Sequence, residues 1–424
     1  MKIPRIQTFD SLIAHKNYRH LWIGNFCANT SIWLQLLTLG WLVKYLTDSH
    51  DTSALFVVGI GGMTALPGLI IGPFAAVLGD KLDRRKLVIF VELLMFMIVV
   101  GFGFLTTTDL IQVWHVYCYA FLAGTREAIT FPVRQALIAN TVPKSHLSNA
   151  FATSVLTIPG TRMLGPFVGG ILLNSTGFFW NFMLEGLLYL GVVLSFWGMK
   201  TPYTEKTNIS VNSSEFSFFK TLFGDVIEGL KYLWFKQRVI PLLYFLAVVP
   251  NGILHPVLFL LPMYTANVLL EGPDYGGYLM AMNGVGGFLM VLMLSAFGFP
   301  SRKGFLCLIA AIGGSVLTFT LSFNFGLIFA FIVLASHGIT QTIYRTTNGL
   351  ITQTLVKDEF RVRANSLYRI SNGSVVFFVI AVGWLATRFT VSTTLLLMGS
   401  LGIFISLLFF GSEKIRNLKN EIEY

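Results

Sequence analysis

Two ionisable residues stand side by side within an apolar stretch of the sequence, AFLAGTREAITFPVRQA. A charged side chain at the centre of a bilayer costs about 2.5–3.5 kcal/mol on insertion scales, so Arg126 and Glu127 each need a partner. Neighbouring residues on a helix point about 100° apart, and we therefore expect these two not to pair with each other. The candidate partners are Glu92 or an anionic substrate for Arg126, and Arg162 or Arg345 for Glu127. The pair is then either an interhelical clamp or an anion anchor beside a protonatable carboxylate.

A second carboxylate, Glu185, stands alone in the middle of another apolar stretch. A carboxyl group in such surroundings can gain and lose a proton as its neighbours change. Glu127 and Glu185 are therefore the predicted proton carriers.

The clearest periodic signal is a polar stripe in the apolar stretch near residue 340. His337, Gln341, Tyr344, Arg345 and Asn348 recur at i, i+4, i+7, i+8 and i+11, which places them on one face of a helix. Lipid cannot satisfy such a face, so it must look into protein or a water-filled cavity. The stripe is either a structural polar seam or part of a substrate site.

Two further apolar stretches carry polar residues near the same periodicity. One holds Tyr244, Asn251 and His255, with prolines at 250 and 256 that can break the helix, and the other holds Asn25, Asn29, Ser31, Gln35 and Thr38. The predicted substrate-contacting residues are Asn25, Asn29, Gln35, Arg126, Asn251, His255, His337, Gln341, Tyr344 and Arg345.

The elements that position these residues follow from composition. The chain has 424 residues, of which 54% are hydrophobic and 12% are charged, whereas soluble domains carry about 25% charged residues. Its mean hydropathy is +0.70. These values indicate an all-α membrane protein with helices of about 20 residues. Twelve spans are predicted, at 21–46, 54–78, 87–106, 110–132, 148–173, 178–199, 239–264, 275–299, 304–323, 325–347, 364–387 and 391–411.

A formal net charge of +10 could indicate nucleic-acid binding, but its distribution argues against it. Lys and Arg gather in alternate loops, such as GDKLDRRK and VKDEFRVR, while opposite loops such as TTTDL and SFNFG hold none. The positive-inside rule then places both termini in the cytoplasm. The three cysteines lie in apolar runs without CxxC or a His/Cys cluster, so we expect no disulfide framework and no metal site.

The longest connection, residues 200–238, divides the spans into an N-terminal six-helix half, 1–199, and a C-terminal half with a cytoplasmic tail, 239–424. Two such halves suggest a secondary transporter built from repeats, with its site near the midplane. Twelve spans alone also fit a channel or a membrane enzyme. The sequence has no selectivity-filter repeat, nucleophile elbow, HExxH or nucleotide loop, so we expect neither.

Several motifs carry a family resemblance over nearly the whole chain. GDKLDRRK resembles the signature loop of the major facilitator superfamily. Within that superfamily, NYRHLWIGNF, FPVRQALIANTVPKSHLSNAFA, TRMLGPFVGG and NGLITQTLVKDEFRVRANSLYRI resemble the enterobactin-exporter and macrolide-efflux branch. The resemblance implies the twelve-helix major facilitator fold, with spans 1, 4, 7 and 10 lining a central cavity.

Two groups of residues acquire roles from this resemblance. The signature loop implies a conformational latch against the other half; the alternative is a turn anchored by its charges. The span-5 motif resembles the antiporter motif of exporters, although close helix packing alone would also explain its small residues. The latch residues are Asp80, Asp83, Arg84 and Arg85, and the span-5 residues are Arg162, Gly165, Pro166, Gly169 and Gly170.

Together these features predict a multi-pass protein of the bacterial inner membrane that rocks about a central site. The expected activity is proton-driven export of an amphipathic organic compound, siderophore- or drug-like. The alternatives are uptake of a metal–siderophore complex or another anionic nutrient, and movement of a lysolipid between leaflets. We expect no enzyme activity and no cofactor beyond the proton gradient. The expected partners are a small-molecule substrate and the lipid bilayer, with no nucleic acid, and the protein is expected to be a monomer.

Overall fold

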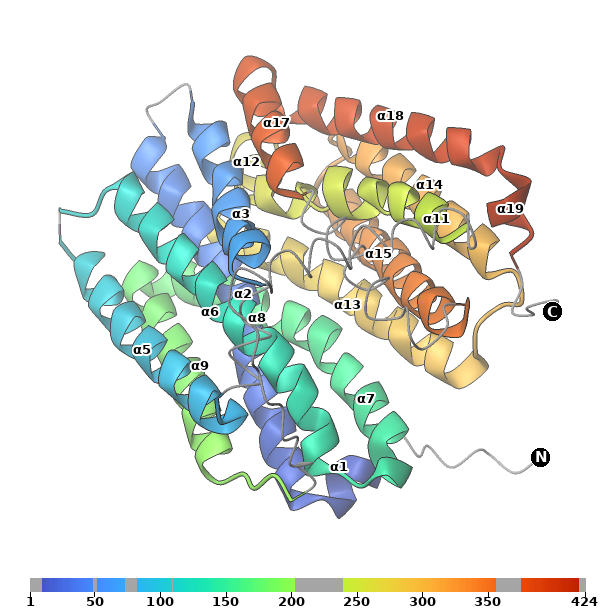
Figure 1. Ribbon diagram of the computed structural model, residues 1–424. Helices are drawn as coiled ribbons and strands as arrows, with labels where there is room; N and C mark the ends of the chain where they lie inside the picture. The colour runs from blue at the N-terminus through green and yellow to red at the C-terminus, as the bar shows by residue number, and fades with distance from the viewer. Residues whose placement is uncertain are drawn as a thin grey trace, which may run out of the picture. The chain divides into compact units, whose positions relative to one another are not determined.

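The computed structural model describes residues 10–48, 52–72, 82–108, 110–202, 239–355 and 375–418. Every regular element within these ranges is a helix (Figure 1). The long helices are α2 (Lys16–Thr47), α3 (Ser53–Ile70), α5 (Arg84–Leu105), α6 (Val113–Thr141), α8 (Thr157–Thr176), α9 (Phe178–Trp197), α13 (Pro273–Phe297), α14 (Lys303–Leu321), α15 (Leu327–Leu355), α17 (Val375–Arg388) and α18 (Val391–Phe410). Shorter helices are α1 (Asp10–Ala14), α7 (Leu147–Val155), α11 (Val239–Leu246), α12 (Val257–Asn267) and α19 (Glu413–Arg416).

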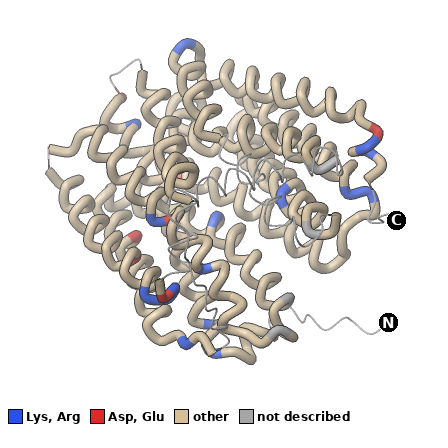
Figure 2. The backbone as a smooth tube through the Cα atoms, viewed as in Figure 1, with Lys and Arg blue, Asp and Glu red and all other residues tan. Residues whose placement is uncertain are grey.

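The predicted spans can be followed one by one in these helices. In the described part of the chain, ten helical segments are long and apolar enough to cross a membrane, and α11 and α12 together count as one of them. The other two predicted spans correspond to α6, which carries Arg126, Glu127 and Arg134, and to α17, which has only 14 described residues. Large apolar side chains are exposed on these helices, as a bilayer-facing surface requires, and charged residues are sparse along them (Figure 2).

By contacts between residues, the chain divides into two compact units. The first comprises residues 1–206 and 259–285, and the second comprises residues 207–258 and 286–424. The segment 259–285 therefore packs with the N-terminal helices, where Ser53 lies 4.0 Å from the sulfur of Met263. Most of the predicted connection 200–238 lies outside the described residues, so a boundary there stays a prediction.

In the first unit, α2 packs against α3, α6, α8 and α9, and α5 packs against α6 and α9. One apolar core joins the ends of these helices around Tyr18, Val88, Ile138 and Phe196. The Tyr18 hydroxyl donates to the carbonyl of Ala150 at 2.6 Å, so the one polar atom of that side chain is satisfied inside the core.

In the second unit, α14 packs between α15 and α18. The helix that begins with α11 is interrupted: α11 ends at Leu246, a π-helical turn η3 (Val248–Ile253) follows, and α12 begins at Val257. Pro250 lies in this turn and Pro256 directly before α12, and each lacks the N–H that a regular helix needs. The break that the prolines predicted is confirmed.

Candidate functional site

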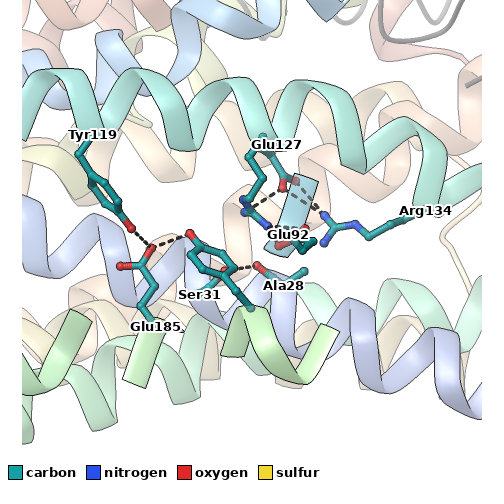
Figure 3. A network of polar contacts seen from close by, with 9 residues as sticks. Ala28, Ser31, Glu92, Tyr119, Glu127, Arg134 and Glu185 are labelled. Carbon is teal, nitrogen blue, oxygen red and sulfur yellow. Dashed lines mark hydrogen bonds and ion pairs between the residues drawn. The ribbon is translucent and has the colours of Figure 1, made fainter. Parts of the chain in front are cut away.

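Arg126 and Glu127 belong to a largely buried charge cluster of four residues, Glu92, Arg126, Glu127 and Arg134. Figure 3 labels Glu92, Glu127 and Arg134. Nη1 of Arg126 donates to both carboxylate oxygens of Glu92, at 2.9 and 3.2 Å, and its Nη2 donates to Oε2 of Glu127 at 3.2 Å. Nη2 of Arg134 donates to Oε1 and Oε2 of Glu127 at 3.2 and 3.1 Å. Two cations thus meet two anions, and the charge cluster has no formal net charge.

Helix geometry brings these side chains together. Arg126 and Arg134 lie eight residues apart on α6, so they share one face, and Glu92 faces them from α5. The side chains of Arg126 and Arg134 are 1% exposed and that of Glu92 is fully buried, whereas Glu127 is 28% exposed. Glu127 is therefore the one member of the charge cluster that is open to its surroundings.

The structure answers the question of partners in three ways. The predicted pairing of Arg126 with Glu92 is confirmed. The expectation that Arg126 and Glu127 do not pair was wrong, because the long guanidinium side chain reaches back to the carboxylate of its neighbour. The ion-pair partners found for Glu127 are Arg126 and Arg134. Arg345 belongs to the second unit, so its pairing with Glu127 stays a prediction. The signal missed was the seven-residue spacing from Glu127 to Arg134, two turns along the helix.

Glu185 lies fully buried on α9, beside the charge cluster. Its Oε1 accepts hydrogen bonds from the hydroxyls of Tyr119, at 2.8 Å, and Tyr189, at 2.6 Å, while its Oε2 has no hydrogen-bond partner. The ring of Tyr189 lies 4.9 Å from the guanidinium carbon of Arg126, within cation–π range. Tyr189 thus connects the lone carboxylate to the charge cluster.

On α8, the charged residue of the span-5 motif turns inward. Arg162 is 5% exposed, and its Nη1 donates to Oδ1 of Asn283 on α13 at 3.0 Å. Its guanidinium carbon lies 4.3 Å from the ring centroid of Trp33 on α2. Arg162 therefore contacts both α13 and α2.

The small residues of the same motif allow close approach of these neighbouring helices. A Cβ atom on Gly165 would lie 2.8 Å from the carbonyl oxygen of Thr30. One on Gly170 would lie 2.9 Å from the Cα of Gly277. Pro166 and Gly169 are also buried on α8. Close helix packing therefore occurs at this motif, and its role in antiport stays a prediction.

The predicted latch loop is described only in part, because Asp80 lies outside the described residues. Asp83 caps α5, where its carboxylate accepts from the backbone N–H of Arg85 at 2.9 Å and of Lys86 at 3.1 Å. Arg84 donates to Asn140 at 3.3 Å, at the end of α6. Arg85 donates to two carbonyl groups at the end of α9, those of residues 196 and 197. These contacts lie within the first unit, and a latch against the other half stays a prediction.

The second unit brings the polar stripe of α15 against the broken helix. His255 and Gln341 lie 3.3 Å apart between Nδ1 and Nε2, and Tyr344 donates to the carbonyl of Leu243 at 2.7 Å. Tyr244 and Thr352 are hydrogen-bonded through their hydroxyls at 3.1 Å. The stripe therefore faces protein, as its periodicity predicted. His337 is buried on it and Arg345 is partly exposed.

Two buried amides stand out beside these contacts. Asn251 in η3 and Asn348 on α15 are 2% and 1% exposed, and neither amide atom of either side chain has a hydrogen-bond partner. An unmade hydrogen bond of this kind costs about 1–3 kcal/mol. Such groups are suited to bind a polar ligand or water.

The predicted substrate residues of the first unit lie mostly on α2. Asn25 and Gln35 are buried, and Asn29 donates to the hydroxyl of Thr157 at 3.2 Å. These residues and Arg126 belong to the first unit, whereas Asn251, His255 and the stripe of α15 belong to the second. Their convergence on one cavity stays a prediction.

Comparison with known proteins places this architecture in a family. The family described as "Transmembrane secretion effector" matches residues 8–423. The Staphyloferrin A transporter of Staphylococcus aureus is 24% identical over 421 residues, which cover 95% of this chain and 96% of that protein. The multi-drug resistance efflux pump PmrA of Streptococcus pneumoniae is 26% identical over 190 residues, which cover 44% of this chain and 46% of the pump.

Among solved structures, a D-xylose–proton symporter aligns with a TM-score of 0.72 at 15% identity, over 95% of this chain and 99% of the symporter. At this identity the likeness shows the fold alone. The predicted all-α membrane fold is confirmed, and ten candidate membrane spans lie within the described residues. The chain belongs to the major facilitator superfamily of membrane transporters, within the family of transmembrane secretion effectors.

Proposed function

We propose that this secondary transporter exports an amphipathic organic acid, siderophore- or drug-like, by alternating access and at the expense of a proton gradient. The observation that carries the proposal is the charge cluster on α5 and α6, because it puts a partly exposed carboxylate against two buried guanidinium groups. Export is supported by the secretion family that the chain matches and by its similarity to an efflux pump. A siderophore-like compound is supported by similarity to a transporter of staphyloferrin A.

The chemistry of the helices suits such a compound. Guanidinium groups bind carboxylate, catecholate and hydroxamate oxygens through paired hydrogen bonds and stay charged when buried. The stripe of α15 adds neutral hydrogen-bonding groups, including Gln341 and the amide of Asn348. Ligand pockets usually combine a few polar anchors of this kind with apolar walls.

Two carboxyl groups are proposed to carry protons. Glu127 is partly exposed and can exchange a proton with the surroundings. Glu185 is fully buried, and its proton must pass through neighbouring groups, of which the hydroxyls of Tyr119 and Tyr189 are in hydrogen-bond contact. We place the protein in the bacterial inner membrane as a monomer with both termini in the cytoplasm, since Lys and Arg gather in alternate loops.

A second function is favoured by one specific observation. Glu127 is held by the same two arginines that would bind an anionic substrate. A proton that neutralises Glu127 would therefore favour binding of the anion, and a proton and an anion that bind together are the pattern of a symporter. Proton-linked uptake of a metal–siderophore complex or another anionic nutrient is the second candidate.

The two directions are separated by growing a strain that lacks the gene, with and without iron, and by measuring siderophore inside and outside the cells. Export predicts that the compound is retained in the cells and depleted from the medium. Uptake predicts normal release but failure to use supplied ferrisiderophore. Plasmid-borne wild-type protein should restore either phenotype, and Arg19→Gln, at an exposed position on α2, serves as the matched charge control. A strain with neither defect would contradict both functions.

A further inference from the structure

We propose that Arg134, assisted by Thr130, is the receptor for a carboxylate group of the transported compound, and that Glu127 occupies this receptor as an internal placeholder. Arg134 was not among the residues predicted from sequence. The inference rests on the proposed transport of an organic acid, and it names the atoms that would bind the acid and the event that would free them.

The hydrogen bonds of Arg134 are incomplete. Its side chain is 1% exposed, and Glu127 is its one hydrogen-bond partner among the described residues. Both bonds use the same nitrogen, Nη2, whereas Nε and Nη1 are buried without a partner. A guanidinium group normally offers two parallel N–H bonds to the two oxygens of a carboxylate. Glu127 does not bind to Arg134 in this way, so a carboxylate that accepted one hydrogen bond from each of two nitrogens of Arg134 would be bound more favourably than Glu127 is.

The distances also mark Glu127 as a weak occupant. Its contacts with Arg126 and Arg134 measure 3.1–3.2 Å. Charge-assisted N–H···O bonds are typically about 2.7–2.9 Å long. The bond from Arg126 to Glu92 reaches 2.9 Å, so the same network holds one firm pair and one looser carboxylate.

The two arginines differ in what remains when Glu127 is neutralised. Arg126 keeps Glu92, which is fully buried against it. Arg134 would keep no anion, and a buried charge without a counter-charge is strongly unfavourable. The charged groups around Glu127 are Arg126 and Arg134 on α6, with Glu92 on α5 behind Arg126. The titratable groups beside them are Tyr189 on α9, behind which Glu185 lies, and Cys27 on α2, which lies near Glu92. Protonation of Glu127 therefore leaves the charge of Arg134 uncompensated and makes the binding of an anion there more favourable.

A second orphaned group points to a ligand at the same place. The hydroxyl of Thr130 is buried and has no hydrogen-bond partner among the residues that the structure describes, and Thr130 lies one helical turn from each arginine on α6. It can donate to one oxygen of a bound carboxylate while Arg134 binds the pair. Since Glu127 is the exposed member of the charge cluster, a ligand reaches Arg134 through the position that Glu127 leaves.

The inference fixes the sign of the proton linkage. Proton binding at Glu127 and carboxylate binding at Arg134 favour each other, so ligand binding at this site takes up a proton. If export is driven by protons that move inward, another group must carry those protons at a different step of the cycle, and Glu185 is the buried carboxyl group available beside the charge cluster.

The test uses the purified full chain in detergent with 1-naphthoate, an aromatic carboxylate that stays ionised at pH 6 and pH 8, and with its neutral amide as control. Wild type should bind naphthoate more tightly at pH 6 than at pH 8, by up to about tenfold per pH unit, and should take up protons on binding, up to about one per ligand. Glu127→Gln should bind at least as tightly as wild type at pH 6, equally at both pH values, and without proton uptake.

The matched variants separate binding from folding. Glu127→Gln combined with Arg134→Gln keeps the charge cluster neutral, and it should fold but bind naphthoate at least about tenfold more weakly than Glu127→Gln alone, since a charge-assisted bond is lost. Combining Glu127→Gln with Arg134→Lys should recover part of this affinity. Arg19→Gln should bind as wild type does, and the amide should not distinguish the variants.

Two results would overturn the inference: equal naphthoate affinity in Glu127→Gln with and without Arg134→Gln, or naphthoate binding by wild type that does not change with pH. The proposed function fails separately. If naphthoate follows the expected pattern but the gene-deletion strain handles siderophores normally, the carboxylate receptor stands and siderophore transport does not. If vesicles with wild-type protein transport siderophore, and vesicles with Glu127→Gln alone or combined with Arg134→Gln transport it with unchanged affinity, the proposed transport is supported and the carboxylate receptor is contradicted.

Discussion

Arg126 and Glu92 form an ion pair in which neither side chain reaches solvent. The pair stabilises the fold but is poorly placed to bind a ligand, because Nη1 of Arg126 already donates to Glu92 and its Nη2 to Glu127. We therefore expect Arg126 to act first as a clamp between α5 and α6. This agrees with the interhelical alternative for the pair, whereas Arg134 is better suited to receive a ligand.

The clamp is tested by removing one partner at a time. Glu92→Gln should destabilise the protein by about 3–5 kcal/mol, because it leaves the buried guanidinium without its closest anion. The double change Glu92→Gln with Arg126→Gln should recover a substantial part of that loss, because the buried guanidinium on α6 is removed together with its closest anion. The measurement is thermal unfolding in detergent for the two single variants and the double variant. Equal melting temperatures for Glu92→Gln and wild type would show that the pair is not a clamp.

At the scale of helices, two contacts between helices lead to testable predictions, one about pH and one about substitution of glycine. The first joins α1 to α7 through Ser11, whose N–H donates to Asn149 at 3.0 Å and whose hydroxyl donates to the carbonyl of His146 at 3.2 Å. His15 completes it, since its Nε2 lies 2.7 Å from Nδ1 of His146. The second is the seam between α8 and α13, where Gly170 meets Gly277.

The contact between α1 and α7 should depend on pH. Partial burial, and to a lesser degree the neighbouring His146, lower the pKa of His15 below its ordinary value of 6.5. The docked state therefore binds fewer protons than the undocked state, so docking is complete above pH 6.5 and weakens as the pH falls below it. The protection factors of the amides in residues 10–14, that is, their exchange rates corrected for intrinsic exchange at each pH, should be lower at pH 5.5 than at pH 7.5. His15→Gln should remove this difference, because the group that titrates is gone, and a pH response that is unchanged in that variant would contradict the prediction.

The seam between α8 and α13 predicts a contrast between two glycines of one helix. A Cβ on Gly170 would press on the Cα of Gly277 and, at 3.0 Å, on the carbonyl oxygen of Asp274, whereas one on Gly160 would meet nothing within 4 Å. Gly170→Ala should lower the melting temperature and the transport rate. Gly160→Ala should be neutral or stabilising by up to about 1 kcal/mol, because alanine favours helix more than glycine does. A melting temperature for Gly170→Ala that is no lower than that of Gly160→Ala would show that the seam tolerates bulk.

For the molecule as a whole, the sequence predicted the spans well because apolar length and the alternation of basic loops are properties of each segment alone. α6 was recognised despite its charges, since Arg126 and Glu127 interrupt a long apolar run. The pairing of Glu127 with Arg126 and Arg134 was missed because it depends on the conformation of two long arginine side chains, which the sequence does not specify. The partners of Arg162 were also beyond prediction, because Asn283 and Trp33 lie on other helices and no local pattern relates them to it.

Proton coupling is a property of the whole transport cycle, and it gives the last prediction. If Glu127 alone carries the coupled proton, Glu127→Gln should abolish proton movement with substrate in vesicles, and Glu185→Gln should leave it. If the proton that drives export resides on Glu185, the result should be reversed, because glutamine keeps the shape of the side chain but cannot release a proton. The measurement is the pH change inside vesicles on addition of substrate, for both single variants and the double variant, with Arg19→Gln as control. Proton movement that persists in the double variant would exclude both carboxyl groups. His255 and His337 would then be the groups to test, because both lie in the polar region around α15 and can bind a proton near neutral pH.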